Sequence, residues 1–263
     1  MLDKITAVVL TYNEVPNIGR LLERVRWSAQ VVVVDSQSTD GTQSLASSFR
    51  NVRVIERAFD DHARQWHFAV HETGITTEWV IALDSDYMLG DEFVAELSAL
   101  SPPAEVNGFI ASFVYCVLGK RLRGSLYPPV PVLFRRSAAR YEQDGHTQRV
   151  QVSGKAQALR NPILHDDRKP LSHWITSQVR YMTLEVEKLR STAWSALRWP
   201  DRLRRLYFVA PILVPFYCLL WRGLILDGYP GLYYTLQRTA AEIILSLLLL
   251  EDRLRSTIRS PRC

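Results

Sequence analysis

Two carboxylates separated by one residue, Asp84 and Asp86, directly follow a run of uncharged, mostly apolar residues, 79–83. A short run of this kind is typical of a strand that is buried on both faces, as in the middle of a parallel sheet. Residues i and i+2 of an extended chain point the same way, so the two carboxylates converge where the strand ends. Such a pair suits Mg²⁺ or Mn²⁺, which also bind substrate phosphates. The alternative is a solvated Asp-Ser-Asp turn ahead of a helix that begins near Asp91.

Polar residues also follow two earlier apolar runs, 5–10 and 31–34, which we predict to be buried strands. In open α/β sheets, ligands bind at the carboxyl ends of the strands. We therefore expect the three strand ends to hold a nucleotide with side chains and to complete the site with a metal. The candidate binding residues at these ends are Thr11, Tyr12, Asn13, Glu14, Asp35, Ser36, Asp84, Ser85 and Asp86.

The segments between these strands have helical patterns. Pro16 fits the first turn of a helix, and Ile18, Leu21, Leu22 and Val25 follow it at helical spacing. Further along we expect a short helix up to residue 49, a strand at 52–55 and a helix at 60–73. Strands and helices that alternate at this pace predict an α/β fold with a doubly wound, mostly parallel sheet.

Two common nucleotide-binding motifs are missing from the sequence. No G-x-G-x-x-G follows the first strand, which argues against a dinucleotide-dependent dehydrogenase. No G-x-x-x-x-G-K-S/T occurs either, so the chain is not a P-loop enzyme. A nucleotidyltransferase would need the same nucleotide and metal, but would normally carry a glycine-rich phosphate loop after the first strand. It remains an alternative function.

Three motifs in order, LTYNE (10–14), VDSQSTDGT (34–42) and LDSD (83–86), resemble family 2 glycosyltransferases. The resemblance is greatest to the bacterial branch that includes lipopolysaccharide inner-core glucosyltransferases. Residues 221–231, WRGLILDGYPG, are similar to a signature of that branch. The resemblance implies a GT-A fold with a Rossmann-like nucleotide-binding half, a nucleotide-sugar donor such as a UDP-sugar, a divalent cation and, usually, inversion at the anomeric carbon.

The resemblance also implies roles for individual residues. Thr11, Tyr12 and Glu14 would line the nucleoside. Asp35 and Ser36 would lie against the base and ribose. Asp84 and Asp86 would face ribose and metal, with Asp86 the stronger metal ligand. Two further substrate-binding candidates, Arg64 and Gln65, take the family's basic and amide positions ahead of the carboxylate strand.

Residues 101–168 should complete the sheet and shape the acceptor side of the site. We expect one long strand at 109–118 and another at 130–136, which is similar to the family's leucine-phenylalanine-arginine strand. Arg135 or Arg136 would hold a phosphate or an acceptor anion. The alternative is that these two arginines form a solvated strand edge.

The general base cannot be transferred from the family, because related enzymes usually carry His-Glu where this chain has His146-Thr147. Inverting transfer needs a group that takes the proton of the acceptor hydroxyl. Asp144, Glu142 and His146 are the candidates, and we favour Asp144 on its Asp-Gly turn. His165 also matches a family position, without an assigned role. The missing His-Glu keeps open a catalytically silent membrane adaptor that has retained the fold.

Charge divides the chain into two parts. Residues 1–167 carry 17 Lys and Arg against 20 Asp and Glu, a net of −3, whereas residues 168–263 carry 15 against 7, a net of +8. We expect a GT-A domain over 1–168, with a nucleotide-sugar half (1–100) and an acceptor half (101–168). A helical C-terminal region over 169–263 should follow it and lie near a membrane. We expect this region to begin with an amphipathic helix at 170–190 and to continue with apolar runs.

The apolar run at 206–221 is shorter than the about 20 residues that span a bilayer, and Pro211 and Pro215 interrupt it. We expect helices that lie in an anionic membrane surface. Four arginines would then contact lipid phosphates: Arg198, Arg202, Arg204 and Arg205. Core or homodimer packing and insertion into the bilayer are the alternatives. Nucleic acid is not expected, since the basic residues alternate with long aliphatic runs.

The three cysteines have no metal-ligand spacing and the first residues no secretory signal pattern, so we expect a reduced, cytoplasmic setting. Together these patterns predict a metal-dependent hexosyltransferase on the inner face of the cell membrane. It would move a hexose from a nucleotide-sugar to a glycolipid or lipid-linked saccharide in lipopolysaccharide or other envelope polysaccharide synthesis.

Overall fold

The computed structural model describes residues 1–145 and 147–259. The chain forms two compact units. The α/β unit comprises Met1–Arg121, Tyr127–Gln143 and Thr147–Lys169. The helical unit comprises Leu122–Leu126, Asp144 and Gly145, and the described residues from Pro170 onward. Two short segments of the first 169 residues thus pack with the helices, which a division by sequence position does not reveal.

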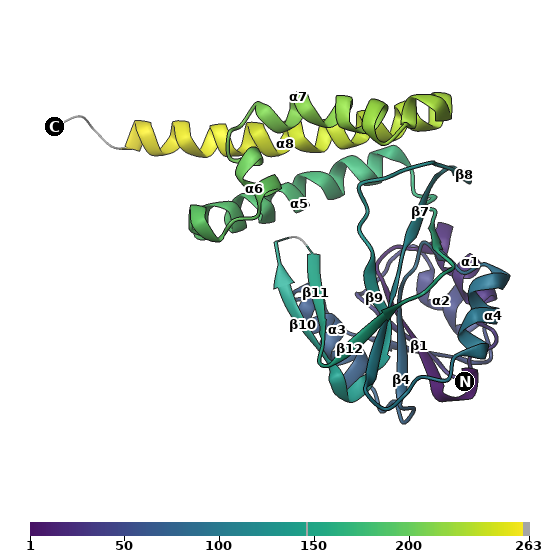
Figure 1. The fold of residues 1–263 in the computed structure, drawn as a ribbon. Helices are drawn as coiled ribbons and strands as arrows, with labels where there is room; N and C mark the ends of the chain where they lie inside the picture. Colours follow the sequence, from purple (N-terminus) through teal and green to yellow (C-terminus); the bar gives the residue numbers. More distant parts are fainter. Residues whose placement is uncertain (146, 260–263) are drawn as a thin grey trace. The chain divides into compact units, whose positions relative to one another are not determined.

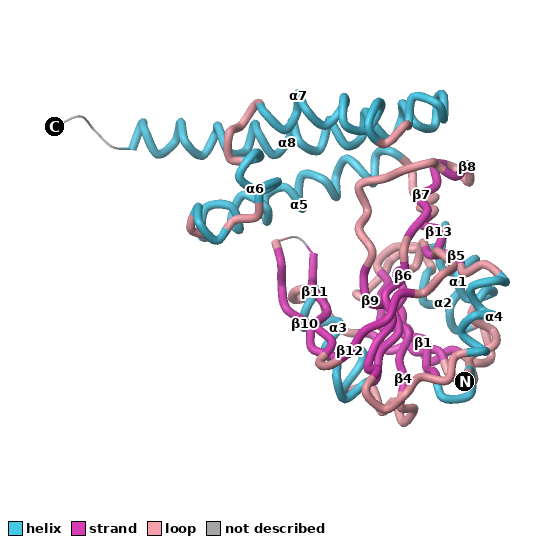
Figure 2. Tube along the Cα trace, in the orientation of Figure 1, coloured by secondary structure: helices cyan, strands magenta, loops and turns pink. Residues whose placement is uncertain are grey.

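A seven-stranded sheet, whose strands are among those drawn in magenta in Figure 2, forms the centre of the α/β unit. Its strands follow the order β12-β6-β9-β4-β1-β2-β3. Neighbouring strands are parallel except at β9, which runs antiparallel to both β4 and β6. The predicted doubly wound, mostly parallel sheet is therefore confirmed. Its strands are β1 (Ile5–Thr11), β2 (Val31–Asp35), β3 (Val52–Glu56), β4 (Trp79–Asp84), β6 (Val106–Ala111), β9 (Val130–Arg135) and β12 (Lys155–Ala158).

Helices cover both faces of this sheet because the side chains of its central strands alternate between two buried clusters. Val9 and Val33 pack with apolar residues of α1 and α4, whereas Val8 and Val32 pack with those of α3. Each fully buried valine contributes about 1.5 kcal/mol or more to folding. The helices of the α/β unit are α1 (Val15–Arg24), α2 (Thr42–Ser47), α3 (His62–His71) and α4 (Asp91–Ala99).

The local sequence accounts for where these helices begin. Pro16 occupies the first turn of α1, where its missing N–H costs no hydrogen bond. The side chain of Asp61 caps α3 by accepting a hydrogen bond from the main-chain N–H of Arg64. Both helices start just after a strand ends, so these caps also fix the loops that carry polar residues.

The single long strand predicted for residues 109–118 is wrong. The chain breaks at Ser112, and its two halves pair in different sheets. Both halves are extended and apolar, so the pattern alone could not show the change of partner. The second half, β7 (Phe113–Val117), joins β5 (Tyr87–Met88), β8 (Lys120–Arg121) and β13 (Ile163–His165) in a four-stranded sheet. Strands β10 (Ala139–Asp144) and β11 (Thr147–Val152) form a separate pair.

The helical unit begins with α5 (Leu171–Ser191) and α6 (Trp199–Arg204). Then α7 (Val209–Phe216) continues into a π-helical turn (Tyr217–Trp221) and a 3₁₀ turn (Leu224–Asp227), and the chain ends in the long α8 (Gly228–Arg259). Figure 1 shows α7 and α5 each lying along α8. Met182, Val186 and Leu189 of α5 form a buried cluster with Leu245 and Leu249 of α8.

All four arginines expected at lipid phosphates have partners inside the helical unit. Arg198 lies 3.7 Å from a carboxylate oxygen of Asp201 and 3.9 Å from one of Asp144. Arg204 binds both carboxylate oxygens of Glu242, at 2.7–3.1 Å. Arg202 donates to the main-chain oxygens of Trp194 and Ser195, at 3.1 and 3.0 Å. Arg205 donates to a main-chain oxygen as well. Arg204 is therefore a structural residue, contrary to the lipid-facing position that its sequence context suggested.

No single helix in residues 1–145 and 147–259 is long and apolar enough to cross a membrane. The segments Val209–Trp221 and Leu224–Ile258 meet the length and composition criteria together, with a bend of 69° between them.

Candidate active site

The register of the central strands brings three polar strand ends to one edge of the sheet. Leu10 of β1 lies beside Asp84 of β4, and Thr11 of β1 lies beside Asp35 of β2. The side chain of Ser85 fixes this edge by donating to the main-chain oxygen of Leu10, at 2.8 Å. The strand ends that the sequence singled out are thus neighbours in space.

Asp84 and Asp86 are both partly buried at this edge, where the side chain of Asp86 is 14% exposed. Burial, and then the charge of Asp86, raise the pKa of Asp84 to about 6. Burial alone would raise the pKa of Asp86. The pKa of Asp86 nevertheless lies below its ordinary value, because the Nε2 atom of His165 lies 2.9 Å from Asp86 Oδ2. The same contact raises the pKa of His165 in spite of its burial. Neighbouring carboxylates with pKa values that move apart are typical of functional sites.

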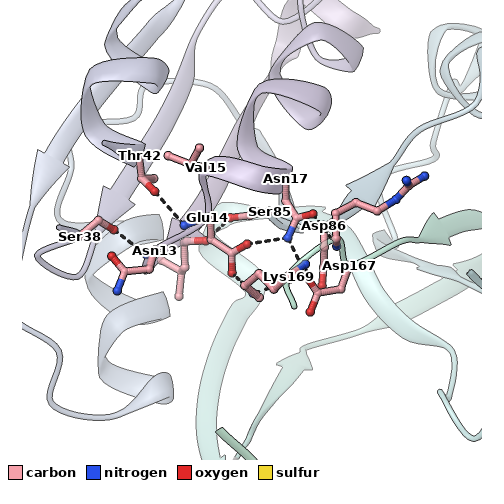
Figure 3. Close-up of polar contacts among 12 residues, drawn as sticks. Asn13, Glu14, Val15, Asn17, Ser38, Thr42, Ser85, Asp86, Asp167 and Lys169 are labelled. Atoms are coloured by element: carbon pink, nitrogen blue, oxygen red, sulfur yellow. Dashed lines mark hydrogen bonds and ion pairs between the residues drawn. The ribbon is translucent and has the colours of Figure 1, made fainter. Parts of the chain in front are cut away.

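The loop after β1 adds a third carboxylate, that of Glu14 (Figure 3). It forms an ion pair with Lys169 and accepts a hydrogen bond from the side-chain amide of Asn17, at 2.8 Å. Asp167 binds the same amide from the other side, at 2.8 Å. Burial raises the pKa of Glu14 to about 7, although the neighbouring Lys169 ammonium opposes the increase. For Lys169 the balance is reversed: burial would lower its pKa, but the charges of Glu14 and Asp167 raise it.

Asp35 is fully buried and uses both carboxylate oxygens within the protein. It accepts hydrogen bonds from Thr11 Oγ1 at 2.7 Å, from the main-chain N–H and hydroxyl of Ser38 at 2.8 and 2.6 Å, and from Gln43 Nε2 at 2.7 Å. In the structure Asp35 therefore organises the loops that follow β1 and β2. Its predicted contact with base and ribose stays a prediction.

Other predicted nucleotide-binding residues lie around the same loops. Gln65, fully buried on α3, donates to the hydroxyl of Ser36 at 3.1 Å. Asn13 has a left-handed backbone, with φ of 55°, and its side-chain oxygen accepts a hydrogen bond from the N–H of Thr39 at 2.9 Å. Tyr12 is exposed. Arg64 is also exposed and lies 3.3 Å from a carboxylate oxygen of Asp61.

Arg135 lies away from the carboxylate edge. It is paired with Trp79 at the opposite end of β4 from Asp84, where its guanidinium stacks 4.7 Å over the Trp79 ring and forms an ion pair with Glu78. Asp84 lies five positions along the strand from Trp79, which is about 16 Å. The next residue, Arg136, donates its main-chain N–H to the oxygen of Glu78. These contacts fit the alternative, in which the two arginines lie at the edge of a strand. They fit less well with arginines that bind an anion beside Asp84 and Asp86.

Two of the three candidates for the general base, Glu142 and Asp144, lie on β10. The carboxylate of Asp144 is 2.8 Å from Lys188 Nζ and 3.9 Å from a guanidinium nitrogen of Arg198, so it belongs to the helical unit by its contacts. Glu142 accepts a hydrogen bond from Gln151 at 2.6 Å. His146 lies outside the described residues. The assignment of Asp144 as base stays a prediction.

Sequence analysis missed Lys169 and Asn17, and gave no role to His165. Lys169 and His165 come from the loop and strand β13 just before the helical unit, about 80 to 155 residues away from the groups they contact. One signal was available: the charged run 166–169 directly follows the short apolar strand 163–165, as at the other three strand ends. Asp166 holds this run in place by accepting hydrogen bonds from Arg20 and Arg168.

The residues present fit a divalent cation. Asp86 Oδ1 is buried and has no hydrogen-bond partner among the described residues, so a buried oxygen is left for a ligand. No group of three or more His, Cys, Asp or Glu side chains with a metal-binding arrangement occurs in residues 1–145 and 147–259. Mg²⁺ and Mn²⁺ need no such cage, because one or two carboxylates and the substrate phosphates hold them. Asp86 and Asp84 are the side chains that would do so.

The mixed sheet, its carboxylate pair at a strand end and the helical C-terminal region are those of a GT-A glycosyltransferase. The fold is similar to that of S. aureus TarS 1–349, crystallised in complex with UDP-GlcNAc, with a TM-score of 0.51 at 14% sequence identity. The alignment covers 97% of this chain and 92% of that one. At this identity the similarity establishes the fold alone.

Residues 6–161 match the family model of Glycosyl transferase family 2, so the chain belongs to that family. The chain is also 27% identical over 200 residues to the lipopolysaccharide core biosynthesis glycosyltransferase LpsC of Rhizobium meliloti (strain 1021), covering 70% of this chain and 71% of LpsC. It is 32% identical over 111 residues to an uncharacterized glycosyltransferase of Rickettsia felis, covering 42% of this chain and 38% of that protein. The family expected from the three motifs is thereby confirmed.

Proposed function

We propose that this glycosyltransferase transfers a hexose from a nucleotide-sugar, with UDP-sugars as the first class to test, to a glycolipid or lipid-linked saccharide. The observation that carries the proposal is the Asp84–Asp86 pair at the same sheet edge as the β1 loop, in which the buried Oδ1 atom of Asp86 has no hydrogen-bond partner among the described residues. The similarity to LpsC supports an acceptor from lipopolysaccharide core synthesis. The UDP-GlcNAc bound by TarS suggests which donor to test first.

In the proposed reaction the acceptor hydroxyl attacks the anomeric carbon from the side opposite the nucleotide, which inverts the configuration there. The bond between that carbon and the diphosphate oxygen breaks, its electron pair leaves with the nucleoside diphosphate, and the hydroxyl proton passes to a base, for which Asp144 is our candidate. A divalent cation at Asp86 and Asp84 would neutralise charge on the departing diphosphate. Lys169, ion-paired to Glu14 in the same site, holds the β1 loop that faces the nucleoside.

A panel of nucleotide-sugars with Mn²⁺, followed by thermal unfolding, tests the donor. A ligand at 100 times its Kd stabilises the native state by about 2.7 kcal/mol, which is a readily measured shift. Transfer from the stabilising donor to a lipid extract, with the anomeric configuration of the product read by NMR, tests the acceptor and the inversion. A donor that binds without any transfer to the extract would instead favour the catalytically silent adaptor.

For localisation we propose the inner face of the cell membrane, in the cytoplasm. The support is the net charge of +8 over residues 168–263, since the cytoplasmic leaflet is anionic and attracts basic segments. Cell fractionation, followed by washing the membranes with salt, tests this placement. Recovery of all the protein in the soluble fraction would contradict it.

A further inference from the structure

The turn between α7 and α8 gathers large apolar side chains on its surface. Residues of the end of α7, the π-helical turn, the 3₁₀ turn and the first turn of α8 contribute to it, and Trp221 and Tyr229 are 80% and 87% exposed. We call this cluster the apolar tip. Its members are Phe216, Leu220, Trp221, Ile225, Leu226 and Tyr229. Scattered exposed apolar residues are normal, but six strongly exposed ones within fourteen residues mark an interaction surface.

Charge is almost absent from the chain around the tip. Residues 206–237 contain only two charged side chains, Arg222 and Asp227. Asp227 is turned inward: it accepts hydrogen bonds from the main-chain N–H of Arg123 at 2.9 Å and from its guanidinium at 3.2 Å. Arg222 lies against the same short segment, where its main chain and side chain approach Gly124 closely. The outward surface of the tip is therefore left to aliphatic and aromatic groups.

We infer that the apolar tip inserts into one leaflet of an anionic lipid membrane. Tryptophan and tyrosine, which flank the leucines of the tip, favour the boundary between hydrocarbon and headgroups. The excess of basic residues in the C-terminal third complements anionic headgroups. A helix with a large apolar surface beside basic residues binds to a membrane through both properties.

The length of the segment before the bend favours insertion into one leaflet. Val209–Trp221 has thirteen residues, about 20 Å of helix, against about 30 Å for the hydrocarbon core of a bilayer. The chain then bends by 69° before Leu224–Ile258. The apolar tip lies at this bend. It can therefore enter the near leaflet of the bilayer without either flanking segment reaching the opposite leaflet.

A second copy of the chain is the rival occupant of this surface. A stable dimer buries about 800 Å² on each partner, usually on a matching face of some length. The tip residues come instead from the end of α7, the π-helical turn, the 3₁₀ turn and the start of α8, four short segments around a bend. Trp221 and Tyr229 are the most exposed of them. Lipid, which adapts to any shape, is the better fit.

Flotation of the full chain with vesicles of phosphatidylglycerol and phosphatidylethanolamine, free of glycolipid, tests the inference. We expect the wild type to float and to remain partly bound in molar salt, since buried apolar area does not depend on screening. The double variant Trp221→Ser, Leu226→Ser should bind at least about tenfold more weakly. The matched control, Phe59→Ser with Leu118→Ser, removes two exposed apolar side chains from the α/β unit and should float as the wild type does.

A second measurement locates the tip in the lipid. Vesicles with brominated acyl chains should quench part of the tryptophan fluorescence of the wild type, and this part should disappear in Trp221→Phe, which keeps the site apolar. Sedimentation of the wild type and the double variant in the absence of lipid gives the oligomeric state. A dimer that becomes monomeric in the double variant, without vesicle binding by the wild type, would overturn the inference in favour of self-association.

Equal flotation of the wild type and the tip variant, or no flotation of either, would also overturn it. The inference rests on the proposed function only for the choice of a membrane as partner. Separate measurements can contradict the inference and the proposed function. Nucleotide-sugar binding, measured on the same proteins by thermal shift, should be unchanged in the tip variant. If the wild type bound no nucleotide-sugar, the proposed function would be contradicted, but the result with vesicles would still support the inference.

Discussion

The α/β unit and the helical unit place apolar and charged side chains in opposite ways. Strand β2 buries four consecutive valines beside Val8 and Val9 of β1, and the carboxylates of Glu14, Asp84 and Asp86 lie at one edge of the sheet. In the helical unit, Glu185, Asp201 and Glu242 are buried, whereas many of its large apolar residues are exposed. The two surfaces are therefore suited to different surroundings.

This contrast explains why the lipid-facing position expected for Arg204 is wrong. A buried carboxylate needs a cationic partner, and Arg204 supplies it for Glu242. Arg204 thus stabilises the interior of the helical unit, and the membrane contact that we propose depends chiefly on apolar residues. In the α/β unit, by comparison, Lys169 compensates Glu14 at the edge where substrate is expected to bind.

The largest expected effect tests the chemical role of the α/β unit. Asp86→Ala should lower turnover by at least about 10³-fold, because it removes the carboxylate proposed to hold the cation. Asp84→Ala should be impaired as well. Transfer assays with Mn²⁺, together with circular dichroism to verify the fold, measure this. Asp91→Ala, which removes an exposed carboxylate at the start of α4, is the control. Wild-type turnover in Asp86→Ala would refute the assignment.

A matched pair of substitutions compares one ion pair in each unit. Lys169→Met and Arg204→Met both leave a largely buried carboxylate without its cation, which typically destabilises a protein by about 3–5 kcal/mol. Denaturant unfolding should therefore show a loss of this order in both. Only Lys169→Met should also weaken nucleotide-sugar binding by the folded protein. Weaker donor binding in Arg204→Met would show that the helical unit takes part in the donor site.

Asp144 tests whether the helical unit contributes to the chemistry, since its carboxylate pairs with Lys188 and Arg198. Asp144→Asn should lower kcat by about 10²-fold with donor affinity unchanged, the effect expected for loss of a general base. Steady-state kinetics of this variant beside Glu142→Gln and His146→Ala decide the assignment. If Glu142→Gln or His146→Ala is inactive instead, the base must be reassigned.

The smallest expected effect is a pH dependence of the metal site. Since the pKa of Asp84 is raised from 3.8 to about 6, its contribution to metal-free stability is fully present below about 3.8 and is lost as pH rises through about 6. A cation needs the ionised form, so Mn²⁺ binding at about pH 5 should be about tenfold weaker than above pH 7. Thermal shifts with Mn²⁺ at both pH values measure this. Glu14→Gln should retain the dependence and Asp84→Asn should lose it.

Much of the α/β unit could be predicted because its signals are local. Continuous apolar runs gave the strands β1, β2 and β4, and the helical spacing after Pro16 gave α1. Parallel strands bring their carboxyl ends to one edge, so the neighbourhood of Thr11, Asp35 and Asp84 followed from the strand assignments alone.

The sequence by itself thus determined the strands, the helices beside them and the carboxylates at one edge of the sheet, since each depends on residues a few positions apart. Only the tertiary structure decided which groups surround those carboxylates. Lys169 meets Glu14, and His165 meets Asp86, across about 155 and 79 residues of chain. It also decided that the chain changes sheets at Ser112 and that Arg204 turns inward to Glu242. These contacts depend on long-range packing, and a pattern of hydrophobicity or charge does not record which partner a side chain meets.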